Sequence, residues 1–150
     1  MKLTQYTDYG LRALISLAVA PERLQTVHSI STAYGISRNH LVKVVARLAE
    51  LGYVETTRGK GGGVRLARPA RQISIGQVVR AMESGLGVVE CLEMDGGRCV
   101  IGPACRLKHL LADATEAFLR SLDGYTLEDV SQQRLPIARL LGIPVAVEAA

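Results

Sequence analysis

Apolar residues recur at helical spacing in several stretches of the chain, and each such stretch predicts an amphipathic helix with one buried face. The clearest stripe repeats at i, i+3, i+4, i+7 and i+10 and consists of Leu41, Val44, Val45, Leu48 and Leu51. A shorter stripe predicts a first helix over residues 9–20. A long stripe near the other end consists of Leu107, Leu110, Leu111, Ala114, Phe118 and Leu122.

The residues before the clearest stripe predict a helix-turn-helix. Residues 26–34 have the pattern of a short helix, and Gly35 ends it, because glycine readily adopts the left-handed conformation found after a helix. We expect Ile36 to pack inward and Ser37 to cap the longer helix. The face opposite the apolar stripe is basic and amide-rich. This succession of elements is typical of helix-turn-helix DNA-binding domains.

A glycine-rich hairpin follows. Residues 53–57 have strand composition, and residues 64–68 alternate apolar and basic side chains. The tip between them, Arg58-Gly59-Lys60-Gly61-Gly62-Gly63, predicts a cationic turn whose glycines let the backbone approach a phosphate chain. The tip is no phosphate-binding P-loop, because the required Gly-Lys-Ser/Thr motif does not precede a helix here. After a helix-turn-helix, such a hairpin is typical of a wing.

The predicted DNA-contacting residues are Ser37, Arg38, Asn39, His40, Lys43, Arg58 and Lys60. The distribution of charge supports them. Residues 1–80 carry 12 Lys/Arg and 4 Asp/Glu, whereas residues 81–150 carry 6 and 10. A basic N-terminal half favours a polyanionic partner, although the charge by itself is explained equally well by a solvated surface. The order of the elements favours double-stranded DNA as the partner, and a palindromic site if the chain binds as a dimer.

The second half predicts a long helix outside the DNA-binding part. A cysteine loop covers residues 85–102, and Pro103 suits the first position of a helix that ends near Gly124. An amphipathic helix of this kind commonly packs on a second copy, and folding back on its own domain fits the same pattern. The predicted fold is mainly α with a small β-hairpin: a winged helix-turn-helix over 1–84, the loop over 85–102, and a dimerisation helix with a tail over 103–150.

The remaining segments carry no chemistry. Residues 126–129 predict a short capped helix, and the apolar tail over 135–147, interrupted by prolines, is expected to dock on the body or on a partner.

The chain has no run of apolar residues long enough to span a membrane. We therefore expect a cytoplasmic protein.

Cys91, Cys99 and Cys105 lie within fifteen residues, in a loop with glycines and acidic residues. An odd number of cysteines argues against a disulfide framework and leaves a metal ion, an iron–sulfur cluster or a redox thiol set. Zinc prefers four thiolate or imidazole ligands, often in close pairs, and His109 could be the fourth. Iron–sulfur clusters are held mainly by thiolates and tolerate the wider Cys-x7-Cys-x5-Cys spacing.

Four segments are distinctive in combination: Asp8-Tyr9-Gly10-Leu11-Arg12-Ala13-Leu14, Gly35-Ile36-Ser37-Arg38-Asn39-His40-Leu41-Val42-Lys43, Arg58-Gly59-Lys60-Gly61-Gly62-Gly63-Val64-Arg65-Leu66 and Pro103-Ala104-Cys105-Arg106-Leu107-Lys108. Together they resemble the bacterial winged-helix iron–sulfur regulators, and in particular their nitric-oxide-sensing repressors. The resemblance implies a homodimer that represses nitric-oxide detoxification genes while its cluster is intact. Nitrosylation or loss of the cluster then releases the operator DNA.

The resemblance also implies a ligand set. The three cysteines would hold the cluster with Asp8 of the other subunit, a [4Fe–4S] cluster being favoured and [2Fe–2S] the alternative. Related cluster-biogenesis regulators use a histidine three residues after the last cysteine, where this chain has Lys108. The first inter-cysteine gap is longer than the family usually shows, with residues 95–97 as an expected bulge. Without the resemblance, Asp8 would serve simply to cap the first helix.

Other functions remain open on the residues alone. A winged-helix repressor could hold structural zinc through the three cysteines and His109. A regulator of the same family could sense cluster level or redox state. A cluster-carrying electron-transfer or cluster-delivery protein could use the basic face to dock an acidic protein. An enzyme is not expected, because no nucleophile–base pair or paired acid–base carboxylates stand out.

Overall fold

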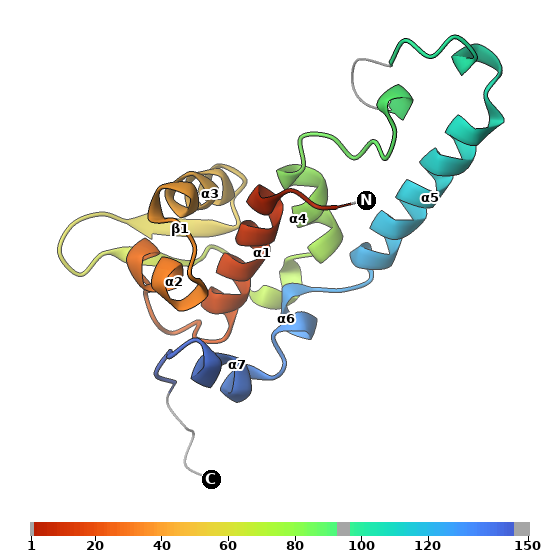
Figure 1. The fold of residues 1–150 in the computed structure, drawn as a ribbon. Helices are drawn as coiled ribbons and strands as arrows, with labels where there is room; N and C mark the ends of the chain where they lie inside the picture. Colours follow the sequence, from red (N-terminus) through yellow and green to blue (C-terminus); the bar gives the residue numbers. More distant parts are fainter. Residues whose placement is uncertain (1, 93–96, 146–150) are drawn as a thin grey trace.

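The structure, a computed structural model, describes residues 2–92 and 97–145. The helices are α1 (Gln5–Ala18), α2 (Val27–Tyr34), α3 (Arg38–Glu50), α4 (Ile75–Met82), α5 (Arg106–Asp123), α6 (Leu127–Val130) and α7 (Arg134–Leu140), and the strands are β1 (Val54–Thr57) and β2 (Gly63–Leu66). Short 3-10 turns are η1 (Ala70–Gln72), η2 (Glu90–Leu92) and η3 (Gly102–Ala104). In Figure 1, α1 lies in the middle of the body and α5 extends away from it.

Helix α1 is the centre of the hydrophobic core. Leu14 and Leu17 are completely buried, and the helix packs against both α3 and α4. Gly10 permits the approach of α4, because a Cβ at this position would lie 2.8 Å from the terminal methyl of Met82. The predicted stripe of α3 is buried against the same core, with Leu41 and Leu48 fully inaccessible. The periodicity of the sequence therefore identified the correct inward face of α3.

The first helix begins four residues earlier than predicted, at Gln5 rather than residue 9, and ends at Ala18. Thr4 is the reason, because its hydroxyl accepts a hydrogen bond from the backbone N–H of Thr7 and caps the helix. Asp8 consequently lies inside the first turn of the helix. The alternative that Asp8 caps this helix is therefore wrong.

The helix-turn-helix and the hairpin form as predicted. Gly35 ends α2 with φ +64°, and Ile36 packs inward with 7% of its surface exposed. Strands β1 and β2 are antiparallel, with Val54 opposite Leu66. Strand β2 is held on its other edge by Gln25, which exchanges two backbone hydrogen bonds with Val64. The wing is thus fastened to the segment that leads into α2.

Helix α5 begins at Arg106, three residues later than Pro103 would place it. Pro103 lies instead in η3, and the extended backbone of Cys105 separates this turn from α5. Among the residues of α5, only Leu119 is buried. The N-terminal part of the helix projects beyond the body, as Figure 1 shows, and leaves Leu107 60% exposed. The apolar stripe of α5 is therefore only partly covered by its own chain.

The segment after α5 returns to the body. Leu127 of α6 is completely buried in the core around α1. Arg134 at the start of α7 donates to the carbonyl of Val19 at 2.6 Å and to the carboxylate of Glu22 at 2.7 Å. Within the expected tail, Ala138 of α7 is completely buried, so this part of the tail lies against the body. Residues 146 and 147, and residues 95 and 96 of the expected bulge, lie outside the described part of the chain.

Within the described residues, every helix is too short or too polar to cross a lipid bilayer.

Candidate nucleic-acid interface and metal centre

The N-terminal face of α3 points into solvent. The backbone N–H of Ile36 donates to the carbonyl of Ser31 at 2.9 Å, which fixes the turn between α2 and α3. We call the exposed residues that follow the recognition face; they are Ser37, Arg38, Asn39, His40 and Lys43. Ser37 occupies the N-cap position, but its hydroxyl makes no capping hydrogen bond. That hydroxyl is available to a phosphate or a base edge.

Two cations of the recognition face lack the acidic partner that a neighbouring arginine of α3 has. Arg47, further along α3, pairs with Glu50 at 3.1 Å. Arg38 and Lys43 have no acidic partner among the residues that the structure describes. An unpaired cation can neutralise a DNA phosphate without first breaking an ion pair, so the structure supports these two side chains as DNA contacts.

The wing also contains both a paired arginine and cations without a carboxylate partner in the described chain. Arg65 of β2 pairs with Glu55 of β1 at 3.0 Å. Arg58 and Lys60 at the tip are exposed, and neither has a carboxylate partner within the described chain. Gly59 between them has φ +93°, which requires glycine because a side chain is strained there. The tip therefore presents two free cations on a backbone that only glycine allows.

A hydrogen bond joins the first helix to the recognition helix. The phenol of Tyr6 donates to the carbonyl of Lys43 at 3.1 Å, so α1 is fastened to the middle of α3. The sequence gives no indication of this contact, since the two residues are far apart and neither is at a motif position. The contact makes the placement of α3 depend on the N-terminal turn of α1.

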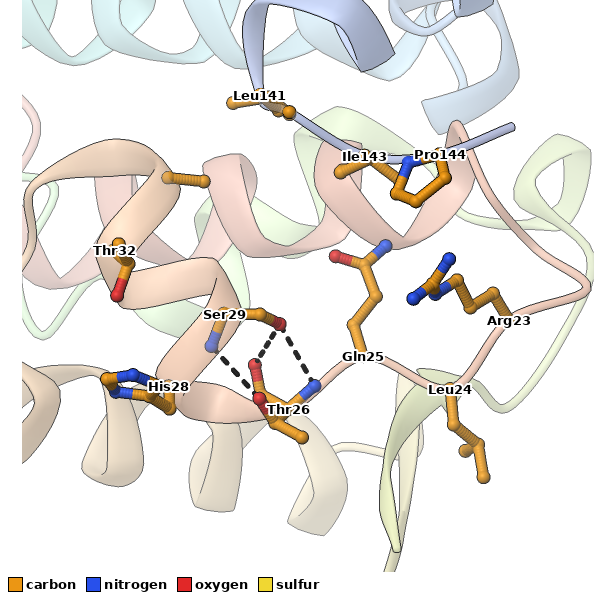
Figure 2. Close-up of a pocket in the computed structure, with 12 residues that line it drawn as sticks. Arg23, Leu24, Gln25, Thr26, His28, Ser29, Thr32, Leu141, Ile143 and Pro144 are labelled. Carbon is orange, nitrogen blue, oxygen red and sulfur yellow. Dashed lines mark hydrogen bonds between the residues drawn. The ribbon is translucent and has the colours of Figure 1, made fainter. Parts of the chain in front are cut away.

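Figure 2 shows a hollow of about 500 Å³ where the N-terminal end of α2 faces residues 141–144. Thr26 and Ser29 form a capping box there, in which the hydroxyl of each accepts from the backbone N–H of the other. Because these polar groups already bond each other, we assign the hollow no ligand. The capping box itself stabilises the start of α2.

All three cysteines lie in the segment that connects α4 to α5. Cys91 lies in η2, Cys99 is exposed, and Cys105 precedes α5; all three thiols are free. Gly97, with φ +58°, lies against the backbone of Cys91, and a Cβ there would be 2.9 Å from its Cα. This close approach requires glycine and brings the segment of Cys99 back beside Cys91.

The donors suit an iron–sulfur cluster by their chemistry, because such clusters are held by thiolates and three free thiols are present. In the described part of the chain, however, no group of three His, Cys, Asp or Glu side chains lies close enough together to hold a metal ion. His109, the fourth donor of the zinc alternative, is exposed on α5. Residues 2–92 and 97–145 thus supply suitable donors but do not bring three of them together.

Asp8 lies on the exposed side of α1, where its carboxylate pairs with Arg12 at 2.8 Å. The guanidinium of Arg12 is also 5.9 Å from the ring centre of Tyr34, the last residue of α2. Burial raises the pKa of Tyr34, so its phenol stays neutral at physiological pH. In the sequence, the ion pair between Asp8 and Arg12 is indicated by their i, i+4 spacing, whereas no local pattern indicates the contact of Arg12 with Tyr34. The predicted ligand is therefore connected to the helix-turn-helix through one arginine.

Comparison with known proteins decides the family. The profile of the Rrf2 family, described as iron-dependent transcriptional regulators, matches residues 3–133. The chain belongs to the Rrf2 family. It is also 50% identical over 142 residues to the HTH-type transcriptional regulator NsrR of Bacillus subtilis strain 168, which covers 94% of this chain and 97% of that protein. The chain is accordingly a DNA-binding transcriptional regulator and not an enzyme, as its sequence predicts.

Solved Rrf2-like structures share the fold. CymR, the global cysteine regulator of B. subtilis, has a TM-score of 0.70 and 28% identity and covers 89% of this chain and 98% of its own. IscR of T. potens has a TM-score of 0.68 and 26% identity, covering 89% and 88%. These likenesses confirm the predicted winged helix-turn-helix with a long helix in the C-terminal half.

Proposed function

We propose that this Rrf2 regulator is a homodimeric repressor that binds palindromic operator DNA and senses nitric oxide through an iron–sulfur cluster. Residues 1–84 would bind DNA, residues 85–102 would hold the cluster, and residues 103–150 would dimerise and dock the tail. The observation that carries the proposal is the set of three free, partly accessible cysteines in one loop of a chain with an unpaired basic recognition face. Such a regulator acts on DNA in the cytoplasm.

Cys91, Cys99 and Cys105 would hold the cluster together with Asp8 of the partner subunit. When bound, the cluster supplies an iron centre that reacts with nitric oxide, and [4Fe–4S] is favoured over [2Fe–2S]. A carboxylate is a hard ligand beside soft thiolates, so the Asp8 bond is the weakest of the set. Asp8 lies on α1 and the cysteines lie between α4 and α5, so a ligand set that combines them would join two elements of the assembly.

Arg12 gives the signal a route to DNA. Arg12 occupies both carboxylate oxygens of Asp8, at 2.8 Å and 3.1 Å, so a bond from Asp8 to iron would compete with this ion pair and weaken it. Arg12 in turn contacts Tyr34 at the end of α2, directly before the turn that positions α3. Exchange of Asp8 between its two partners therefore alters the support of the recognition face.

Dimerisation would use the exposed part of α5. Leu107 and Leu110 are 60% and 55% exposed, and they belong to the apolar stripe that the body leaves uncovered. Complete burial of an exposed leucine contributes about 1.5–3 kcal/mol, and these two side chains would gain roughly half of that each, which favours a second copy over solvent. Two recognition helices separated by one DNA turn, roughly 34–36 Å, would then fit a palindrome.

Anaerobic purification tests the proposal. A brown protein with iron and sulfide in stoichiometric amounts, which binds a palindromic promoter and releases it on addition of nitric oxide, is expected. A colourless protein that contains zinc supports the zinc-binding repressor instead. A brown protein without salt-dependent binding to palindromic DNA supports electron transfer or cluster delivery.

A second candidate within the family is a regulator that responds to cluster level or redox state. It is favoured by the free thiols and by the likeness to CymR of Staphylococcus aureus, solved in an oxidised form, at a TM-score of 0.69 and 27% identity over 88% of this chain. DNA release by oxidants, without any response to nitric oxide, would identify it.

A further inference from the structure

The N-terminus of α1 is tied to the end of α4 by a carboxylate. The backbone N–H of Thr4 donates to Oε1 of Glu83 at 2.8 Å, and the hydroxyl of Thr4 donates to the same oxygen at 3.0 Å. Glu83 directly follows the last residue of α4. Glu83 therefore fastens the end of α4 to the start of α1 through a residue 79 positions away in the sequence.

This arrangement completes a capping box from a distant element. In an ordinary capping box, a Glu or Gln at the third helical position accepts from the backbone N–H of the N-cap residue. Here that position holds Thr7, whose own N–H is bound by Thr4 and whose hydroxyl lies 3.2 Å from that of Thr4. Glu83 takes the missing role and adds a negative charge at the N-terminus of α1, where the helix dipole favours it.

Glu83 also lies at the junction of the two parts of the proposed cluster site. The cysteine loop starts just after it, and Asp8 lies one helical turn beyond the Thr4 that it holds. Arg80, one turn earlier on α4, binds Glu116 and Asp123 of α5. The end of α4 thus connects α1, the loop and the proposed dimerisation helix.

We propose that Glu83 is a positioning residue that sets Asp8 in register with the cysteine loop by capping α1. This inference rests on the proposed function, because it assumes that Asp8 is a cluster ligand. In the dimer, Asp8 serves the partner's cluster while the loop serves the chain's own. Glu83 therefore connects the two cluster sites. Disorder where the cysteine loop of one subunit begins would displace Asp8 of that subunit, which is the ligand of the partner's cluster.

The first measurement uses the protein without cluster. In Glu83→Ala, amide hydrogen exchange of residues 4–8 should be about threefold to tenfold faster than in wild type, as expected on loss of charge-assisted hydrogen bonds. Glu83→Gln keeps an oxygen that can accept both bonds and should restore slow exchange. Exchange that is unchanged in Glu83→Ala overturns the inference, since the tie would then not order α1.

The second measurement uses the holoprotein with a chelator under anaerobic conditions. Glu83→Ala should lose the cluster absorbance about threefold to tenfold faster than wild type, and Glu83→Gln at nearly the wild-type rate. In an Asp8→Ala background, Glu83→Ala should add almost nothing, because a residue that acts through Asp8 is silent without it. An equally large effect in both backgrounds overturns the inference.

Thr26→Ala is the matched control, because it removes a threonine cap of the same type from α2. It should leave the rate of cluster loss unchanged, and a comparable acceleration would show that Glu83→Ala acts merely by loosening the fold.

If the wild-type protein holds no cluster at all, the proposed function fails. The exchange measurement alone then supports or overturns the tie between Glu83 and α1.

Discussion

Asp8 is the residue whose role depends most on its surroundings. Its carboxylate is exposed and pairs with Arg12, while Thr4 provides the cap of α1. An exposed i, i+4 pair contributes roughly 0.3–0.5 kcal/mol, so replacing Asp8 disturbs the fold little. We predict that Asp8→Asn keeps nearly the wild-type thermal unfolding midpoint but loses its cluster faster in chelator, because an amide is a poor iron ligand. Absorbance decay and calorimetry measure the two effects.

Arg12→Gln is the control for this prediction. It breaks the same ion pair but keeps the carboxylate, so the cluster should be retained. Replacing any of the three cysteines should abolish stable cluster binding and, with it, tight operator binding. If Asp8→Asn holds the cluster and responds to nitric oxide like the parent, the fourth ligand lies elsewhere and His109 is the next candidate.

The unpaired cations give a second prediction for single residues. Arg38→Ala should lower operator affinity by about 1–3 kcal/mol and relax sequence preference, since this residue is at the N-terminal end of the recognition helix. Lys60→Ala should weaken binding to all sequences alike and reduce the salt slope by about one. Titrations of operator and unrelated DNA at several salt concentrations measure both effects.

Arg65→Ala is the matched control in the wing. Arg65 is already paired with Glu55, so its removal should change affinity less than Lys60→Ala does. If both Arg38→Ala and Lys60→Ala left operator affinity untouched at low salt, the assignment of the recognition face and wing would be wrong.

At the scale of elements, the junction of α4 and α5 is held by charge as well as packing. Arg80 binds Asp123 at 2.8 Å and Glu116 at 3.1 Å, and the hydrogen bond that its guanidinium donates to Asp123 is the main cause that raises the pKa of Arg80. We predict that Arg80→Ala lowers the thermal unfolding midpoint and speeds amide exchange in α5, because one side chain spans two turns of that helix. Exchange mass spectrometry reports on α5 directly.

Arg120→Ala provides the comparison. Arg120 lies on the same helix, is exposed, and has no carboxylate partner in the described structure. It should leave exchange in α5 at the wild-type rate. Equal exchange in wild type and Arg80→Ala would show that apolar packing around Leu119 alone holds α5 in place.

At the scale of the whole molecule, the projecting half of α5 predicts the assembly. Leu110→Asp should convert the dimer to a monomer, because a charge would have to be buried in the proposed apolar interface. Affinity for the palindromic operator should fall steeply, whereas affinity for a half-site should stay the same. Sedimentation and paired binding titrations measure these outcomes.

Leu140→Asp is the control for surface charge. Leu140 of α7 is 86% exposed and lies outside the apolar stripe of α5, so the variant should remain dimeric. A Leu110→Asp protein that stays dimeric and binds the palindrome normally would place the interface elsewhere on the molecule.

The sequence by itself determined the elements that depend on local chemistry. The buried stripe of α3, the left-handed Gly35 after α2 and the glycine-rich wing tip follow from helical periodicity and from allowed backbone conformations. The three-cysteine loop and the basic recognition residues were also visible, because their chemistry lies in residue types at short spacing. These features need no knowledge of the remaining chain.

Tertiary structure alone decided which of these residues are free and which helices are tied together. Glu83 completes the cap of α1 by accepting from the backbone of Thr4, 79 positions away. Arg134 fastens the tail to Val19 across 115 positions. Such contacts form between groups that only packing brings within hydrogen-bonding distance, so no local pattern encodes them. The fold therefore determines how the DNA-contacting and cysteine-bearing parts of this regulator are joined.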